Sequence, residues 1–310
     1  MQNSRFFSPL AAVCIALLFM VGCATAPEDD TVEAELIDDD QGELFLWTVE
    51  YNEAVLHIYG SIHLATADVY PLPDIVYDLF ESSDRLVLEI DLETTGPEAF
   101  FGVQSLMEYP AGGSLEDDLT SDEIELLSNT LAEIGIPFDM VKELKPWVIE
   151  ATIVSNLASQ QGIDAEHGID MHFAQLASDL EMPVDALETV EDQLSIFGNL
   201  PSRTQAAELM RTITNYQDIN AYIEQLLEIW RDGDLNAMKE ILSAALLADP
   251  NLEPYYDAMF AGRNRKWIDQ LSGYLQSDEE IFAVVGTGHL VGPDNVIELL
   301  RAQGFRAIRH

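Results

Sequence analysis

Two copies of a Gly-x-x-His pattern, at residues 60–63 and 286–289, hold the side chains best suited to chemistry. Each copy directly follows an apolar run that predicts a buried strand. Glycine lets the backbone turn tightly, and a histidine just past a strand end lies where ligands bind in α/β sheets. The chain has six histidines, and two share this context. We therefore predict that His63 and His289 meet in one site.

Two acidic residues also lie at the ends of predicted strands. Glu89 lies at the end of the apolar run 86–90, and Glu188 follows residues 184–187, so both belong at the ligand-binding edge. Two imidazoles with one or two carboxylates suit zinc, manganese or cobalt, with a position left for water. The same set suits metal-free acid–base catalysis. Structural alternatives are an arginine partner for Glu89 and helix capping for Glu188.

Arg263 and Asn264 lie in a predicted helix of a chain with only 14 basic residues. A buried arginine can orient a carboxylate or stabilise an oxyanion, whereas a salt bridge in so acidic a protein is the structural alternative. The remaining predicted site residues are Glu89 and Glu188 as catalytic groups, and Asn264, Ser61 and Thr287 as substrate contacts. His172 and His167 are predicted to be packing or surface residues.

The N-terminal residues predict the compartment. Arg5 precedes the apolar run 10–21, which is shorter than a membrane span and typical of a signal peptide covering residues 1–22. The run ends in a sequence that resembles a bacterial lipobox, so we predict lipidation of Cys23 and an envelope location, on the outer membrane and facing the periplasm. Residues 23–43 are acidic and lack aromatics, which predicts a disordered tether.

The composition limits the choice of partners. The net charge is −42, from 56 acidic and 14 basic residues. This argues against nucleic-acid binding, which needs clustered Lys and Arg to neutralise phosphates. We expect a peptide or small-molecule partner, and contact with a membrane only through the lipid anchor. The chain contains neither an HExxH motif nor a G-x-S-x-G motif, so neither zincin nor α/β-hydrolase serine chemistry is indicated.

Residues 44–310 predict one α/β domain. Its predicted strands are 44–50, 54–59, 85–90, 183–187, the run before Gly286, and 305–308. Helices dominate the middle, between 97 and 275, so we predict a central mixed sheet with a large helical insertion. The strands ending before Gly60 and Gly286 should share one edge.

Three finer expectations concern helix boundaries. One helix is predicted over residues 205–230, and another over 254–275. The last helix is predicted to begin at Pro293, which suits a first helical turn. Asp170 is predicted to help cap the helix 169–180.

Six segments in order carry a family resemblance: GSIHLA at 60–65, LVLEID at 86–91, LKPW at 144–147, ALETVEDQL at 186–194, Arg263-Asn264, and VVGTGHLVGPDNVIELLRAQGF at 284–305. Together they resemble the TraB/GumN family, which is similar to the Tiki metalloproteases and more distantly to the erythromycin esterase and ChaN haem-binding groups. The resemblance implies an α/β fold with both histidines in one cleft. It also implies metal binding by His63, His289 and Glu89.

Three hypotheses of function follow from these observations. The first is a metal-dependent hydrolase of peptides or related amides, in which Glu188 or Glu89 activates water and Arg263 stabilises the oxyanion. The second is a non-catalytic lipoprotein that binds and sequesters a peptide or haem. A third reading is a metal-independent esterase with a histidine base, which would survive chelator treatment.

Overall fold

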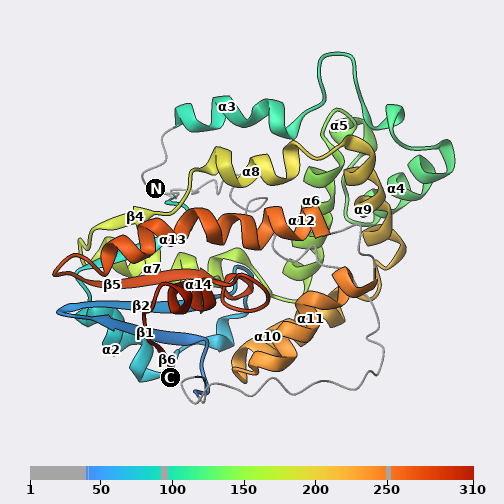
Figure 1. Ribbon diagram of the computed structural model, residues 1–310. Coiled ribbons are helices and arrows are strands. Elements are labelled where there is room, and N and C mark those ends of the chain that lie inside the picture. Colours follow the sequence, from blue (N-terminus) through green and yellow to red (C-terminus); the bar gives the residue numbers. More distant parts are fainter. Residues whose placement is uncertain (1–39, 41, 92–96, 249–252) are drawn as a thin grey trace, which may run out of the picture. The chain divides into compact units, whose positions relative to one another are not determined.

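The computed structural model describes residues 40, 42–91, 97–248 and 253–310 (Figure 1). The predicted signal peptide, the lipidation site Cys23 and nearly all of the predicted tether lie outside the described residues. The chain divides into two compact units. One contains the described residues of Val21–Asp91, Glu166–Glu188 and Glu224–His310, and the other those of Leu92–Ala165 and Thr189–Ile223.

The first unit is built on a six-stranded sheet with the order β4-β3-β5-β2-β1-β6. Its strands are β1 (Leu46–Tyr51), β2 (Ala54–Ser61), β3 (Arg85–Leu88), β4 (Val184–Ala186), β5 (Glu280–Gly286) and β6 (Ala307–Arg309). The strands β4, β3, β5 and β2 are parallel, while β1 runs antiparallel to both of its neighbours. The mixed sheet confirms the predicted α/β fold class.

The register brings four strand ends to one edge of the sheet. Ser61 at the end of β2 pairs with Gly286 at the end of β5. Leu88 at the end of β3 pairs with Val284 of β5 and with Ala186 of β4. Because these strands are parallel, the residues that follow them emerge on the same side. This confirms that both Gly-x-x-His patterns start from one sheet edge.

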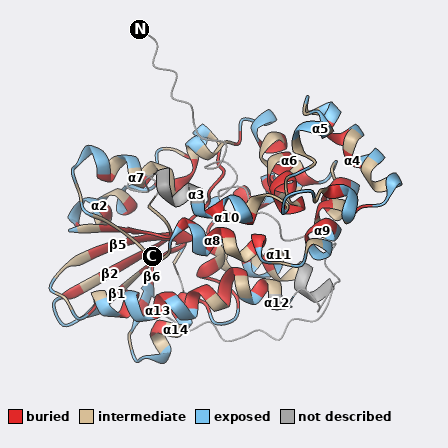
Figure 2. Cartoon of the chain, turned by 90° about the horizontal axis from the view of Figure 1, so that it is seen from above, coloured by how far each residue is buried: buried red, intermediate tan, exposed pale blue. Residues whose placement is uncertain are grey.

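Aromatic packing holds the sheet against two helices, α2 (Asp74–Ser82) and α7 (Ile169–Asp179). Phe80 of α2 and Phe173 of α7 pack against each other with ring centroids 5.0 Å apart, and both contact Phe282 of β5. Figure 2 shows the central strands β2 and β5 largely buried. Large aromatic rings contribute the most apolar area per residue, so this cluster fixes how α7 approaches the sheet.

The C-terminal helices differ from the sequence expectation at two boundaries. A π-helical turn, Asp257–Ala261, separates α12 (Glu253–Tyr256) from α13 (Gly262–Tyr274) inside the predicted helix 254–275. The last helix, α14, spans Val296–Ala302 and is capped by Asn295, whose side chain accepts from the Glu298 amide. Pro293 therefore precedes the helix, because an Asn side chain satisfies the first-turn amides better than a proline does.

The second unit is helical. It contains α3 (Pro97–Met107), α4 (Ser121–Glu133), α5 (Phe138–Val141), α6 (Pro146–Gln160), α8 (Val190–Gly198) and α9 (Ser202–Thr214). Thr189 caps α8 in a capping box with Asp192. The predicted helix 205–230 is wrong as a single element. It ends at Thr214, where the Asn215 side chain turns back onto the Arg211 carbonyl, and α10 (Ile219–Arg231) follows. Helix α11 (Leu235–Ala248) belongs to the first unit.

A buried carboxylic acid in the helical unit predicts a pH-dependent stability. Glu150 of α6 is 1% exposed and accepts a hydrogen bond from Thr212 of α9 at 2.6 Å. Burial raises the pKa of Glu150 from 4.5 to about 8. The folded chain therefore holds a proton that the unfolded chain releases between these values, and stability falls as pH rises through that window. We expect Glu150→Gln to flatten this slope and to be the more stable protein at pH 8, on the order of a few kcal/mol.

Urea unfolding at several pH values measures this effect. Glu125→Gln, on an exposed position of α4 in the same unit, is the matched control and should keep the wild-type slope. A Glu150→Gln variant with the wild-type pH profile would show that Glu150 is not the group responsible.

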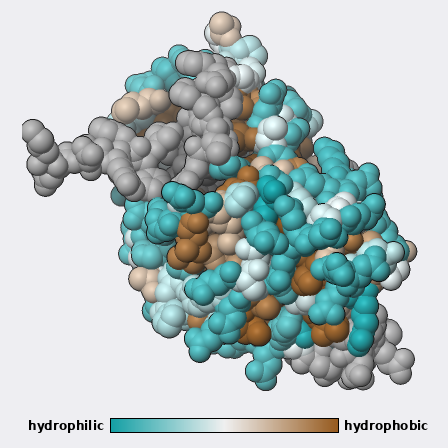
Figure 3. All heavy atoms as spheres, turned by 90° about the vertical axis from the view of Figure 1, so that its left-hand side faces the viewer, coloured by the Kyte–Doolittle hydropathy of each residue, from teal (hydrophilic) through white to brown (hydrophobic). Residues whose placement is uncertain are grey.

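The described surface agrees with the acidic composition. The face drawn in Figure 3 is predominantly hydrophilic, with apolar residues in small separate areas. Within the described ranges, no helix combines the length and the hydropathy needed to cross a bilayer.

Candidate functional site

His63 is held by a carboxylate on the neighbouring helix. The Ile169 amide donates to the Ile62 carbonyl at 3.0 Å, which fixes the start of α7 beside the first Gly-x-x-His pattern. Asp170, in the first turn of α7, then lies 2.9 Å from Nδ1 of His63. An ionised carboxylate only accepts hydrogen bonds, so the Nδ1 of His63 carries a proton. The imidazole is thereby oriented by Asp170.

The opposite nitrogen of His63 is buried without a partner. His63 is only 8% exposed, and none of the described residues forms a hydrogen bond with its Nε2. Burial lowers the pKa of His63, but the Asp170 carboxylate outweighs burial and the pKa lies above its ordinary value. Buried polar atoms are nearly always paired. The lone nitrogen therefore indicates a position for water or a ligand.

His289, by contrast, has both ring nitrogens engaged. Its Nδ1 lies 2.6 Å from the Asn264 Oδ1, and the Asn264 amide nitrogen donates to the Asp294 carbonyl, which fixes the orientation of the amide. Its Nε2 lies 2.8 Å from Nη1 of Arg263. An arginine can only donate, so Nε2 accepts and Nδ1 carries the proton. Burial and the Arg263 charge lower the pKa of His289 to about 3, so this imidazole is neutral.

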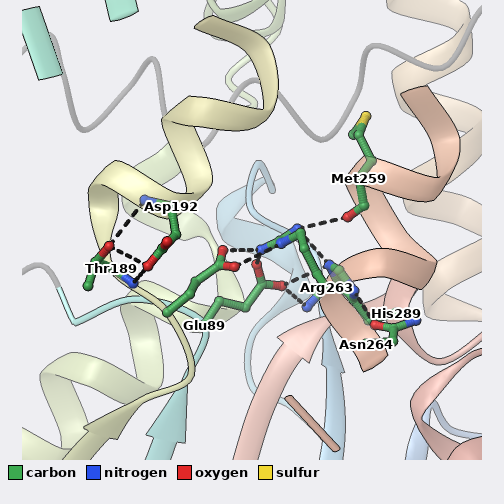
Figure 4. Close-up of polar contacts among 9 residues, drawn as sticks. Glu89, Thr189, Asp192, Met259, Arg263, Asn264 and His289 are labelled. Carbon is green, nitrogen blue, oxygen red and sulfur yellow. Dashed lines mark hydrogen bonds and ion pairs between the residues drawn. The ribbon is translucent and has the colours of Figure 1, made fainter. Parts of the chain in front are cut away.

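Arg263, on α13, lies at the centre of the cluster drawn in Figure 4. It is 3% exposed and uses all five of its N–H groups. Nη1 donates to the Met259 carbonyl at 3.1 Å and to His289. Nη2 donates to Glu89 at 2.5 Å and to Glu188 at 2.5 Å, and Nε donates to Glu188 at 3.1 Å. The indole of Trp267 lies 4.6 Å from the guanidinium carbon.

Glu89 and Glu188 lie side by side because their strands are paired. The Glu188 amide donates to the Glu89 carbonyl at 2.9 Å, which continues the ladder between β3 and β4. Glu89 is 5% exposed, and its second oxygen accepts from the Gly286 amide at 2.6 Å. Burial raises the pKa of Glu89, but the charge of Arg263 and the other neighbours outweigh it and lower the pKa to about 2. Glu89 is therefore ionised.

Gly286 leaves the space in which these groups meet. A Cβ atom on Gly286 would lie 3.1 Å from Glu89 Oε1, 3.3 Å from His63 Nε2 and 3.7 Å from His289 Cδ2. Any larger residue would occupy the approach to all three. Gly288 is also required, because a Cβ there would collide with the ring of Phe260. The glycines of the second pattern thus provide room for the neighbouring side chains.

The two Gly-x-x-His patterns differ in how many of their polar side-chain atoms have hydrogen-bond partners among the described residues. In the second pattern, Thr287 donates its hydroxyl to the Ser61 carbonyl at 2.9 Å, and His289 has two partners. In the first, neither the Ser61 hydroxyl nor His63 Nε2 has a partner among the described residues. Ser61 is 2% exposed and pairs in register with Gly286. The first pattern is therefore the side of the site that a ligand would complete.

The structure brings together most of the residues predicted from the sequence. Arg263 joins Glu89, Glu188 and His289 in one cluster, and His63 Nε2 lies beside it at Gly286. Asn264 contacts the cluster through His289, whereas Thr287 bonds to the Ser61 carbonyl. The catalytic and substrate-binding roles assigned to them stay predictions. The partnership of Asp170 with His63 was missed. Asp170 was predicted to cap α7, but the N-cap residue is Gly168 and no side chain caps the helix.

The predicted metal ligands lie together but are not arranged as a metal site. Across the described ranges, no group of three or more His, Cys, Asp or Glu side chains is placed to hold a metal ion. His63 Nε2 suits such a role, because it is buried and accepts no hydrogen bond from the residues that the structure describes. His289 Nε2 and Glu89 instead accept hydrogen bonds from the positively charged Arg263. The residues as arranged do not fit a metal ion, and metal ligation by them stays a prediction.

The fold and site together define an α/β protein with a buried arginine, carboxylate and imidazole cluster at the carboxyl edge of its sheet. The chain belongs to the TraB/PrgY/gumN family, whose model matches residues 45–309. This confirms the resemblance found in the sequence.

Curated relatives extend the comparison. The chain is 28% identical over 247 residues to the uncharacterised protein YbaP of Escherichia coli, covering 79% of this chain and 87% of that protein. It is 22% identical to the metalloprotease TIKI2 of Danio rerio, covering 94% of this chain and 66% of that protein. It is 23% identical to the metalloprotease TIKI1 of Homo sapiens, covering 86% and 62%. No solved structure matches the chain.

Proposed function

We propose that this protein hydrolyses peptide or related amide bonds at the site formed by His63, Asp170 and Ser61. The observation that carries the proposal is the buried Nε2 of His63, which has no partner among the described residues while its other nitrogen is held by Asp170. The neutral form of His63 is the active base, because only that form presents an Nε2 lone pair in a fixed direction to the reacting proton. The distant similarity to proteins named metalloproteases supports hydrolysis as the reaction and a peptide as the substrate class.

The chain's own residues supply the proton transfers. As a water oxygen attacks the carbonyl carbon, His63 Nε2 takes the proton from that water. When the carbon–nitrogen bond breaks, the same nitrogen returns the proton to the leaving amine. Asp170 holds the Nδ1 proton throughout and stabilises the imidazolium that forms between these steps. Each turnover consumes one water and releases a carboxylic acid and an amine.

The oxyanion needs a donor, and we assign the Ser61 hydroxyl to this role. It is buried and has no partner among the described residues. Arg263 was predicted from the sequence to be this donor, but its five N–H groups are occupied by internal acceptors. We therefore place Arg263 as a positioning residue, which holds Glu89, Glu188 and His289 around the reacting groups.

Cleavage of a mixed peptide library by the purified full-length protein tests the proposed function. In water enriched in ¹⁸O, mass spectrometry should find one ¹⁸O atom in each new carboxyl terminus. Binding of peptides without any cleavage would instead support the sequestering protein considered from the sequence, and would overturn the proposal.

Palmitate labelling of Cys23 tests the envelope location, which we retain as a proposal.

The role of Ser61 predicts a loss in kcat. Ser61→Ala removes one hydrogen bond to a developing charge, worth about 1.5–3 kcal/mol, so kcat should fall by roughly 10- to 100-fold with KM nearly unchanged. Ser272→Ala is a matched control, because Ser272 is also buried but donates to the Asp269 carbonyl. An unchanged kcat in Ser61→Ala would remove Ser61 from the mechanism.

A further inference from the structure

The charges of the cluster are already partly balanced from within. Glu89 and Glu188 place two buried carboxylates against one guanidinium, and each accepts from the same Nη2 of Arg263. The side chain of Arg263 is 4% exposed, and those of Glu89 and Glu188 are 5% and 8% exposed. A buried anion requires a cation nearby. In this arrangement the cation is an arginine.

Arg263 also donates a hydrogen bond to the lone pair of His289. A neutral imidazole has one lone pair, and Asn264 fixes the His289 proton on Nδ1. The remaining lone pair, on Nε2, accepts from Arg263 Nη1 at 2.8 Å. A metal ion could bind His289 Nε2 only after this hydrogen bond is broken.

Moving Arg263 aside would break more than one bond. Its Nε and Nη2 donate hydrogen bonds to the two oxygens of Glu188. Nη2 also donates to Glu89, and Nη1 donates to the Met259 carbonyl. A divalent ion beside an undisplaced guanidinium would meet a like charge inside a buried site, where such repulsion is strong. The atoms that accept hydrogen bonds from Arg263 can therefore bind either the arginine or a metal ion, but not both.

We infer that Arg263 occupies the cation position of this site, and that Arg263 and a divalent metal ion exclude one another. The protein as it stands then holds no metal on His289 and Glu89. The inference concerns the site of the proposed function but not its turnover. Metal binding can be measured whether or not the protein cleaves peptides, so the two proposals can fail separately.

Histidine nitrogen NMR tests the inference on the unaltered full-length chain. With ¹⁵N-labelled histidine, His289 should show a protonated Nδ1 and an unprotonated Nε2. Addition of Zn²⁺, with excess Mg²⁺ to occupy surface carboxylates, should leave both His289 signals unmoved. His289→Asn assigns these signals. A Zn²⁺-dependent shift of His289 Nε2 would overturn the inference.

A cobalt titration supplies the second test, with Arg263→Met as the variant. Removing the guanidinium should expose His63, Glu89 and His289 to the ion, so Arg263→Met should bind one Co²⁺ at least about tenfold tighter than wild type. The bound ion should show the intense visible bands of low-coordinate cobalt, and these should vanish when His289→Asn is added. Equal binding of one such Co²⁺ by wild type would overturn the inference. If Arg263→Met does not fold even with Co²⁺, the NMR result decides.

Discussion

Arg263→Met is expected to be the most destabilising single substitution in the site. It would leave the carboxylates of Glu89 and Glu188 buried without their shared counter-ion. Removing one partner of a buried ion pair typically costs about 3–5 kcal/mol, because an uncompensated charge remains. Urea unfolding of the purified proteins measures the loss.

The same helix offers a matched control. Arg265 lies two residues further along α13 and bridges Asp257 and Asp294 with a side chain that is 45% exposed. Because solvent screens exposed pairs, Arg265→Met should change stability little. Adding Glu188→Gln to Arg263→Met removes one of the two carboxylate charges that Arg263 had balanced and should restore part of the loss. Equal stability of Arg263→Met and Arg265→Met would show that the buried cluster is not held by its charges.

The sequence predicted the meeting of distant residues because parallel strands impose it. An apolar run followed by glycine and histidine occurs twice, and paired parallel strands end at one edge. The observed pairing of Ser61 with Gly286 follows from that rule. Glu89 and Glu188 could be placed by the same argument, since each follows a strand of this sheet.

Other contacts had no signal in the sequence. Asp170 reaches His63 only because α7 docks through the Ile169 amide on the Ile62 carbonyl. An acidic residue in the first turn of a helix equally suits a cap, so its type and spacing could not separate the two roles. The five acceptors of Arg263 come from four separate segments of the chain. Such saturation depends on tertiary geometry, and it distinguishes a positioning arginine from an oxyanion donor.

His63→Ala is expected to have the largest effect on activity. It removes the base from the site, and general base catalysis contributes about 10²- to 10⁴-fold, so kcat for peptide cleavage should fall within that range. Stability should also fall, by about 1.5–3 kcal/mol, because the change removes the charged hydrogen bond between Nδ1 and Asp170, so kcat is compared on protein shown to be folded. His172→Ala, on α7 and in contact with Tyr77, removes a histidine outside the cluster and should retain activity.

Asp170→Asn probes the same base without deleting it. An asparagine amide can donate to His63 Nδ1, which would move the ring proton to Nε2 and remove the lone pair that faces the substrate. The expected loss in kcat is therefore about as large as that of His63→Ala, and the double variant should be no worse than either single one, since residues that act as a unit are not additive. The two residues do not act as one base if the loss in kcat of the double variant equals the product of the two single losses. Full turnover by folded Asp170→Asn would show the same.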